Sequence, residues 1–210
     1  MVSELEPPAA TNGYRRVVLT FDDGTADHLR AGAELTLRGL TGIFFVPAGK
    51  VDAPGYLKRE ELRELQSLGH VIGSHAFHHA PLAALSRDEV AVELTRSRDF
   101  LTDALDTEIR YFAPPGGITN RFLSDELERH GFIASRSMRW GLYRSAGERW
   151  NVPCIPVTQV TLTRGWVART LERWELPTAM RSAWVVKRAM PARLRFTLRS
   201  AAHERLRGTA

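Results

Sequence analysis

Short apolar runs alternate along the chain with longer segments in which apolar residues recur every three or four positions. Each apolar run is expected to be a buried β-strand. These runs cover residues 17–21, 42–46, 71–74, 111–113 and 132–135. The segments between them predict helices over 31–40, 58–68, 86–105 and 120–130. Alternation of strands and helices at this spacing predicts parallel strands joined by crossover helices.

Residues at the ends of these segments support the assignment. Pro47 ends the run 42–46, and Gly69 follows the expected helix 58–68 as a C-terminal stop. Ser86, with Glu89 three residues later, is typical of a capping box that opens a long helix. Residues 152–162 are expected to be extended.

Polar residues with metal-binding and acid–base chemistry follow two of the expected strands. Asp22 and Asp23 come after the first, and His75 and His79, four residues apart, come after the third. A set of one carboxylate and two imidazoles leaves coordination positions open for water and substrate, as a hydrolytic metal centre requires. The second carboxylate could then act as base on that water. The alternative is that the two aspartates only cap a turn before glycine.

Two segments together carry a resemblance to a known family. Thr20-Phe21-Asp22-Asp23-Gly24 and Ser74-His75-Ala76-Phe77-His78-His79 resemble the motifs of the polysaccharide deacetylase family, also called carbohydrate esterase family 4 or the nodulation-type deacetylase domain. The resemblance runs from about residue 17 to about residue 157. It implies an α/β fold, a distorted (β/α) barrel with fewer than eight units.

The resemblance also implies roles for the residues of both motifs. Asp22 would be the catalytic base, and Asp23, His75 and His79 would bind one divalent metal ion. Zinc suits this ligand set, although cobalt, nickel or iron would also bind. His78 has the wrong spacing for joint binding with His75, so we expect it beside the site or facing solvent.

Further residues are expected around this centre. The segment 114–117, Pro-Pro-Gly-Gly, allows the backbone to approach a substrate closely. The resemblance implies that the amide of Gly116 donates to the oxyanion, with Pro115 against the substrate. Trp140 and Tyr143 are expected to line the sugar, with a place in the core as the alternative for Trp140. His28 is expected to overhang the site and contact the substrate.

The chain departs from the family pattern in two places. Ala113 stands where many members have an arginine that pairs with the base, and Arg139 precedes Trp140 where they have an aspartate. We therefore predict that Arg139 supplies the cation beside Asp22, with Arg110 as the competing candidate. The family's later Leu-x-x-His, whose histidine protonates the leaving amine, has no counterpart in residues 154–160.

Composition places the chain among ordinary globular proteins. It has 210 residues, of which 43% are hydrophobic and 25% charged, which suits one domain with a real core. The single cysteine, Cys154, excludes an internal disulfide framework. The first residues are acidic and carry prolines, unlike a secretory signal. If Met1 is the native start, we expect a cytoplasmic protein, with the inner face of the membrane as a peripheral location.

Charge is unevenly distributed between two parts of the chain. Residues 164–210 carry 11 basic and 3 acidic residues with three tryptophans, whereas residues 1–163 carry 18 basic and 21 acidic ones. We expect a catalytic domain over 1–163 and a basic helical tail over 164–210. Such a tail suits an anionic membrane surface or a phosphorylated carrier, or else packs on the barrel as an amphipathic helix. Nucleic acid is not expected, because no recognition motif accompanies the charge.

These features predict a metal-dependent hydrolase that removes an N-acetyl group from an amino sugar in a surface polysaccharide, a glycolipid or a precursor. Two alternatives stay open. A non-catalytic carbohydrate-binding protein of the same fold is favoured by Ala113 and by the absent Leu-x-x-His. A deformylase that acts on a lipid-linked sugar is favoured by the basic tail.

Overall fold

Six parallel strands form one curved sheet in the computed structural model, which describes residues 17–117, 119–143, 146–158 and 164–173. The order of the strands in the sheet is their order in the chain. They are β1 Leu19–Phe21, β2 Gly42–Val46, β3 Val71–Ser74, β4 Tyr111–Phe112, β5 Ala134–Trp140 and β6 Val152–Cys154.

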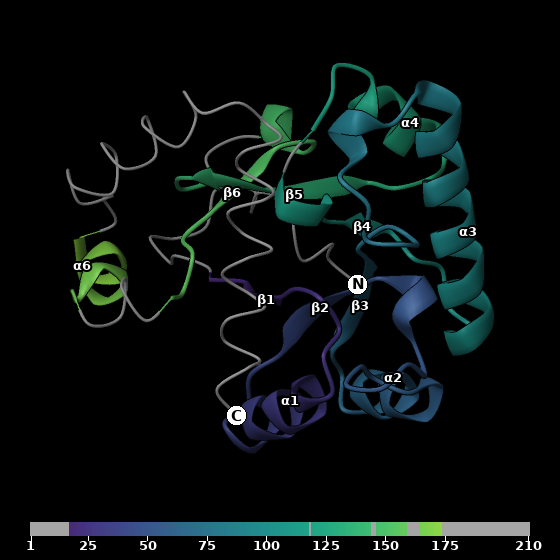
Figure 1. The fold of residues 1–210 in the computed structure, drawn as a ribbon. Helices are drawn as coiled ribbons and strands as arrows, with labels where there is room; N and C mark the ends of the chain where they lie inside the picture. Colours follow the sequence, from purple (N-terminus) through teal and green to yellow (C-terminus); the bar gives the residue numbers. More distant parts are fainter. Residues whose placement is uncertain (1–16, 118, 144–145, 159–163, 174–210) are drawn as a thin grey trace.

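A helix follows each of the first four strands and covers the outer side of the sheet (Figure 1). These helices are α1 Asp27–Leu37, α2 Arg59–Ser67, α3 Arg87–Leu105 and α4 Leu123–Arg129. Short 3₁₀ turns are η1 Ala48–Lys50, η2 Leu82–Ala84, η3 Pro115–Gly117 and η4 Ala146–Glu148. Six strand units arranged in this way make a half-barrel, which confirms the predicted distorted barrel with fewer than eight units.

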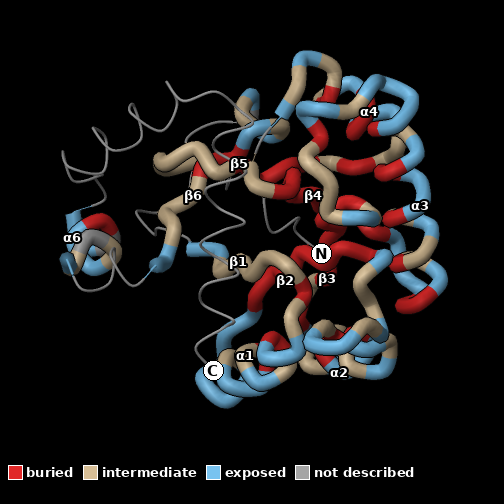
Figure 2. Tube along the Cα trace, viewed as in Figure 1, coloured by how far each residue is buried: buried red, intermediate tan, exposed pale blue. Residues whose placement is uncertain are grey.

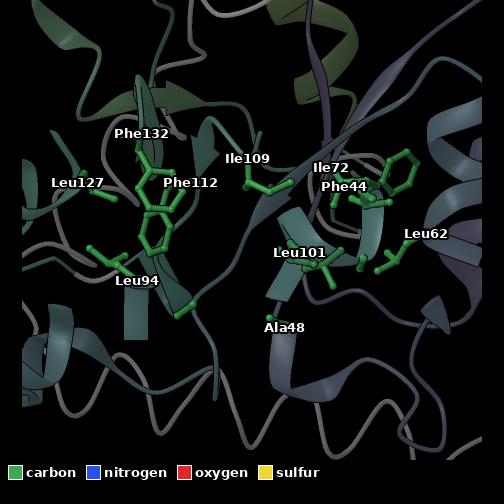
Figure 3. Packing of buried hydrophobic residues seen from close by; sticks show 14 of the residues in the cluster. Phe44, Ala48, Leu62, Ile72, Leu94, Leu101, Ile109, Phe112, Leu127 and Phe132 are labelled. Carbon is green, nitrogen blue, oxygen red and sulfur yellow. The ribbon is translucent and has the colours of Figure 1, made fainter. Parts of the chain in front are cut away.

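The core lies on both faces of the central strands. All five residues of β2 are buried, with Phe44 packed among the helices and Phe45 in a separate cluster on the inner face. Burial on both faces explains why β2 is apolar throughout rather than alternating. Buried residues therefore follow β2, β3 and β4 in Figure 2, and Figure 3 shows Leu94 and Leu127 of the helices beside Phe112.

Element ends agree with the sequence in most places. Ser86 caps α3, because its Oγ accepts the Glu89 amide at 3.3 Å while the Glu89 carboxylate accepts the Ser86 amide at 2.7 Å. The expectation that 17–21 is a buried strand is wrong. Val17 is 57% exposed and β1 begins at Leu19, because β1 lies at an edge of the sheet and pairs only with β2 among the described residues.

The described part of the basic segment is short. Helix α6 spans Trp166–Arg173, and residues 174–210 lie outside the described residues. The division into a catalytic domain and a tail, the cellular location and binding to a membrane therefore stay predictions. Among the residues that the structure describes, no helix has the length and apolar character needed to cross a membrane.

Candidate active site at the carboxyl ends of the strands

The predicted ligands converge where β1 and β3 end. These strands flank β2. The His75 amide donates to the Val46 carbonyl at 2.9 Å, which continues the pairing of β2 with β3 beyond Ser74. One carboxylate oxygen of Asp23 lies 3.3 Å from Nε2 of His75 and 3.0 Å from Nε2 of His79. The three ligand atoms all lie within 4.8 Å of one another.

The orientation of His75 suits metal binding. Its ring is buried, and Nδ1 must donate to the Ala113 carbonyl, 2.6 Å away, because that oxygen can only accept. Nε2 is then the unprotonated nitrogen of the neutral ring and faces Asp23, which is the arrangement seen where a backbone carbonyl orients a metal-binding histidine. Two imidazoles and a carboxylate form a donor set that fits zinc or a similar divalent cation.

The backbone at the site adopts conformations that L-residues rarely take. Asp23 has φ 81° and His79 has φ 61°, both in the left-handed region. Strained residues of this kind persist only where the surrounding structure holds them, and they are common at functional sites. The backbone of two of the three candidate ligands, Asp23 and His79, is therefore held in a strained conformation by the surrounding structure.

Asp22, the predicted base, is paired with Arg136 of β5. The Arg136 guanidinium donates to the Asp22 carboxylate and is itself almost fully buried. Its Cζ atom lies 5.5 Å from the centre of the Phe45 ring. Burial alone would raise the pKa of Asp22, but the charge of Arg136 and the hydrogen bond from its guanidinium lower it below its usual value. Asp22 is therefore held as a carboxylate.

This finding corrects the prediction for Arg139. The Arg139 side chain pairs instead with Glu148 at 2.5 Å, where both side chains are about one third exposed. Regular alternation would direct residues 136 and 139 to opposite faces of a strand. The apolar run 132–135 predicts a strand that ends at Ser135, whereas β5 continues to Trp140. The signal that could have found Arg136 is a single cation between two serines within an extended segment.

Arg136 lies beside the position from which the expected arginine is missing. Phe112 of β4 is in register with Ser135 of β5, so the next pair along the two strands is Ala113 and Arg136. Ala113 is fully buried, and its small side chain leaves room there. The cation beside the base thus comes from the neighbouring strand, about 4.8 Å away. The exposed Arg110 is not needed for this position.

The turn after β4 is built tightly against β5. Gly116 and Gly117 have φ 68° and 67°, and the Gly117 amide donates to the Pro114 carbonyl at 2.8 Å. A Cβ on Gly117 would lie 2.3 Å from Met138, so only glycine fits. Because the Gly117 amide is used within the turn, the Gly116 amide remains the candidate oxyanion donor. Pro115 of the same turn is buried.

The remaining predicted residues have different positions. His28 is 8% exposed and its ring packs against Phe21 and Phe44, with centroids 5.8 and 5.6 Å apart. Burial lowers the pKa of His28. His28 therefore lies in an aromatic layer, and its contact with a substrate stays a prediction.

Trp140 and Tyr143 lie at and after the carboxyl end of β5, and both are partly exposed. The Trp140 Nε1 atom is buried and has no hydrogen-bond partner among the described residues. Contact of either residue with a sugar stays a prediction.

Comparisons with known proteins agree with this geometry. The family model described as polysaccharide deacetylase matches residues 9–134. The peptidoglycan-N-acetylglucosamine deacetylase PgdA of Listeria monocytogenes is 33% identical over 124 residues, which are 58% of this chain. The chain spans 25% of the length of that relative.

Two solved structures share the fold. IcaB from Ammonifex degensii superposes with a TM-score of 0.65 at 26% identity, over 70% of each chain. The deacetylase PplD of Streptococcus pyogenes, solved in complex with acetate, also superposes with a TM-score of 0.65, at 21% identity over 74% of this chain and 72% of that one. At that identity the likeness to PplD concerns the fold alone. The family match covers more than half of the 210 residues, and with the half-barrel and the paired motifs it shows that this protein belongs to the polysaccharide deacetylase family.

Proposed function

We propose that this protein hydrolyses the N-acetyl group of an amino sugar in a glycan or glycolipid, with one divalent metal ion held by Asp23, His75 and His79. The observation that carries the proposal is the meeting of two sets of residues at one edge of the sheet. One set can hold a cation, and the other is a carboxylate kept ionised by a buried arginine. When bound, the cation would supply Lewis-acid chemistry, polarising the acetyl carbonyl and making water a stronger nucleophile.

Asp22 takes the proton of the attacking water in this mechanism. Its lowered pKa keeps it ready to accept a proton near neutral pH, and the Arg136 guanidinium fixes the direction of its carboxylate. As the water oxygen bonds to the acetyl carbon, the Gly116 amide donates a hydrogen bond to the carbonyl oxygen, which gains negative charge.

Release of the sugar amine requires that a proton be returned. No histidine occurs between His130 and His203, so the usual acid of the family has no counterpart in the described residues 146–158. In our proposal Asp22 carries out both transfers, first as base and then as acid. The C–N bond breaks as the amine takes the proton from Asp22, and acetate leaves.

The main alternative is a binding protein of the same fold. Ala113 favours it, because the family arginine beside the base is absent there. Arg136 argues against it, since the structure places a buried cation on Asp22 from the neighbouring strand. A protein that only binds sugar has no use for an ionised carboxylate held beside a metal-binding cluster.

The test is product release by the purified full-length protein. Zinc-loaded protein is incubated with N-acetylated chito-oligosaccharides and with peptidoglycan fragments, and the released acetate and free amine are measured. We expect the two products in equal amounts. An N-formylated panel separates deformylation, and Asp22→Asn protein is the control for contaminating activity. Sugar binding without release of either acid, on every substrate, would contradict the proposal and favour the binding protein.

A further inference from the structure

The segment that carries both candidate histidine ligands has an unusual backbone. Ala76 and His79 have φ 62° and 61°, although neither is a glycine. The segment follows β3 directly and turns His79 back toward Asp23, to which its Nε2 lies 3.0 Å away. A backbone of this shape persists only if its surroundings hold it at several points.

Residues near η1 hold the carbonyl groups of this segment. The Ala48 amide donates to the Ala76 carbonyl at 3.1 Å, and the Gly49 amide donates to the Phe77 carbonyl at 2.9 Å. A Cβ on Gly49 would lie 2.9 Å from the Phe77 ring, so the contact is close. These bonds hold carbonyl groups of the turn only, and its amide groups need other partners.

Glu93 of α3 holds the amide groups. One oxygen of its carboxylate accepts the Phe77 amide at 3.0 Å and the His78 amide at 2.9 Å. The other oxygen lies 2.5 Å from Nδ1 of His78. Glu93 is 5% exposed, and hydrogen bonds to a buried carboxylate are stronger than those between neutral groups.

The same face of α3 makes further contacts with this region. Ser97 lies one turn after Glu93 on the helix, and its Oγ is 2.7 Å from Oγ of Ser74, the residue before His75. Arg96 stacks on the Phe77 ring, 3.9 Å from its centre. The contacts with Glu93 thus belong to a packed interface between α3 and the ligand segment.

We propose that Glu93 is a positioning residue, which sets the affinity of the site for metal by fixing the backbone between His75 and His79. The proposal rests on the proposed function in so far as that assigns metal binding to these histidines. Residues that orient metal ligands from behind typically change metal affinity by 10- to 100-fold when they are removed. His79 depends on Glu93 more than His75 does, since the Ala113 carbonyl already orients His75.

Replacement of Glu93 in the full-length protein tests this role through metal affinity. Zinc or cobalt affinity is measured by competition with a chelator. In Glu93→Ala the affinity should fall about 10- to 100-fold. Glu93→Gln should stay near the wild type, because the amide oxygen still accepts both backbone amides and the amide nitrogen can donate to Nδ1 of His78. The metal affinity of Glu93→Asp, whose side chain is shorter by one methylene, should lie between those of the other two variants. This variant replaces Glu93→Ala in the test if Glu93→Ala does not fold.

Glu126 supplies the matched control. It is a carboxylate on α4 that is also buried, at 1% exposed, and it pairs with Arg87 at 2.6 Å rather than with the ligand segment. Glu126→Ala should lower the melting temperature but leave metal affinity unchanged. An equal loss of affinity in Glu126→Ala and Glu93→Ala would show a general effect of stability and would overturn the proposal.

Hydrogen exchange of the metal-free protein gives a second readout. The amides of Phe77 and His78 should exchange faster in Glu93→Ala, and they should keep their protection in Glu93→Gln and Glu126→Ala. Wild-type metal affinity together with unchanged protection in Glu93→Ala would overturn the role of Glu93. If affinity and protection respond as expected but no acetate is released from any substrate, the proposed function fails and the role of Glu93 stands.

Discussion

The two halves of the candidate site differ in how regular their strands are. The metal-binding half rests on β1 and β3, which pair with β2 in continuous register over three and four residues. The half that supports the base rests on β4 and β5. There β4 has two residues, and β5 shifts its register against β6 between Arg136 and Trp140.

This difference shows which parts of a site depend on strand ends alone. In the regular half, a residue just after a strand must lie at the carboxyl edge of the sheet, so its place follows from the chain. In the irregular half, four residues of β5 span the same distance as two residues of β6, so the inward-facing positions change within the strand. The cation beside Asp22 comes from Arg136, where this irregularity begins, and the irregularity separates it from Arg139.

Replacing the base should have the largest effect. Asp22→Asn is expected to lower kcat by about 100- to 10,000-fold, because removal of a general base typically costs that much. The neighbouring ligand set is unchanged, so metal content should stay close to that of the wild type. The melting temperature should fall, because Arg136 loses its buried charged partner. Retention of more than about a tenth of the wild-type kcat would mean that Asp22 is not the base.

Removing the buried cation should have an intermediate effect and should show itself in the pH profile. Arg136→Met takes away the charge that lowers the pKa of Asp22, so this pKa should rise. Activity requires the ionised carboxylate, so the acidic limb of kcat against pH should move to higher pH. An unchanged limb in an active, folded variant would contradict the role of Arg136.

The same ion pair should appear in the pH dependence of stability. The pKa of Asp22 is lowered in the folded state, so its contribution to the free energy of unfolding is present above the ordinary value of 3.8. That contribution is lost as the pH falls through the lower, folded-state pKa. Denaturant titrations of the metal-free wild type and Arg136→Met give the free energy of unfolding between about pH 3 and 7. The difference between the two proteins should therefore be largest near pH 7.

Replacing Arg139 should have the smallest effect, and it provides the control for Arg136 on the same strand. Arg139 pairs with Glu148 in a partly exposed position, where an ion pair contributes roughly 0 to 1 kcal/mol. Arg139→Ala should leave the acidic limb of the pH profile in place. A shift equal to that of Arg136→Met would reinstate Arg139 as the partner of Asp22.

Much of the fold was predictable from the pattern of the sequence. The bounds of β2 and β3 agree with the apolar runs 42–46 and 71–74, because these strands are buried. Pro47 directly follows β2, and Gly69 shortly precedes β3. The start of α1 at Asp27 was missed, since no side chain caps that helix. The extent of β5 was missed because Arg136 and the serines beside it interrupt the apolar pattern.

The site divides in the same way. Asp23, His75 and His79 were predicted together, and the structure brings them together, since all three follow strand ends. Arg136 and Glu93 were missed, because both lie within long elements and reach the site through tertiary contacts. The burial of His28 could not be predicted, because its distance from Gly24 says nothing of the aromatic rings that enclose it.

The central claim is that Asp23, His75 and His79 form a metal centre on which hydrolysis depends. The most direct measurement is metal content and acetate release in the same preparations of wild-type and His75→Ala protein. We predict one divalent metal ion per wild-type chain, and loss of both the metal and the activity in the folded variant. Full metal occupancy in His75→Ala, or acetate release at the wild-type rate without metal, would contradict the account.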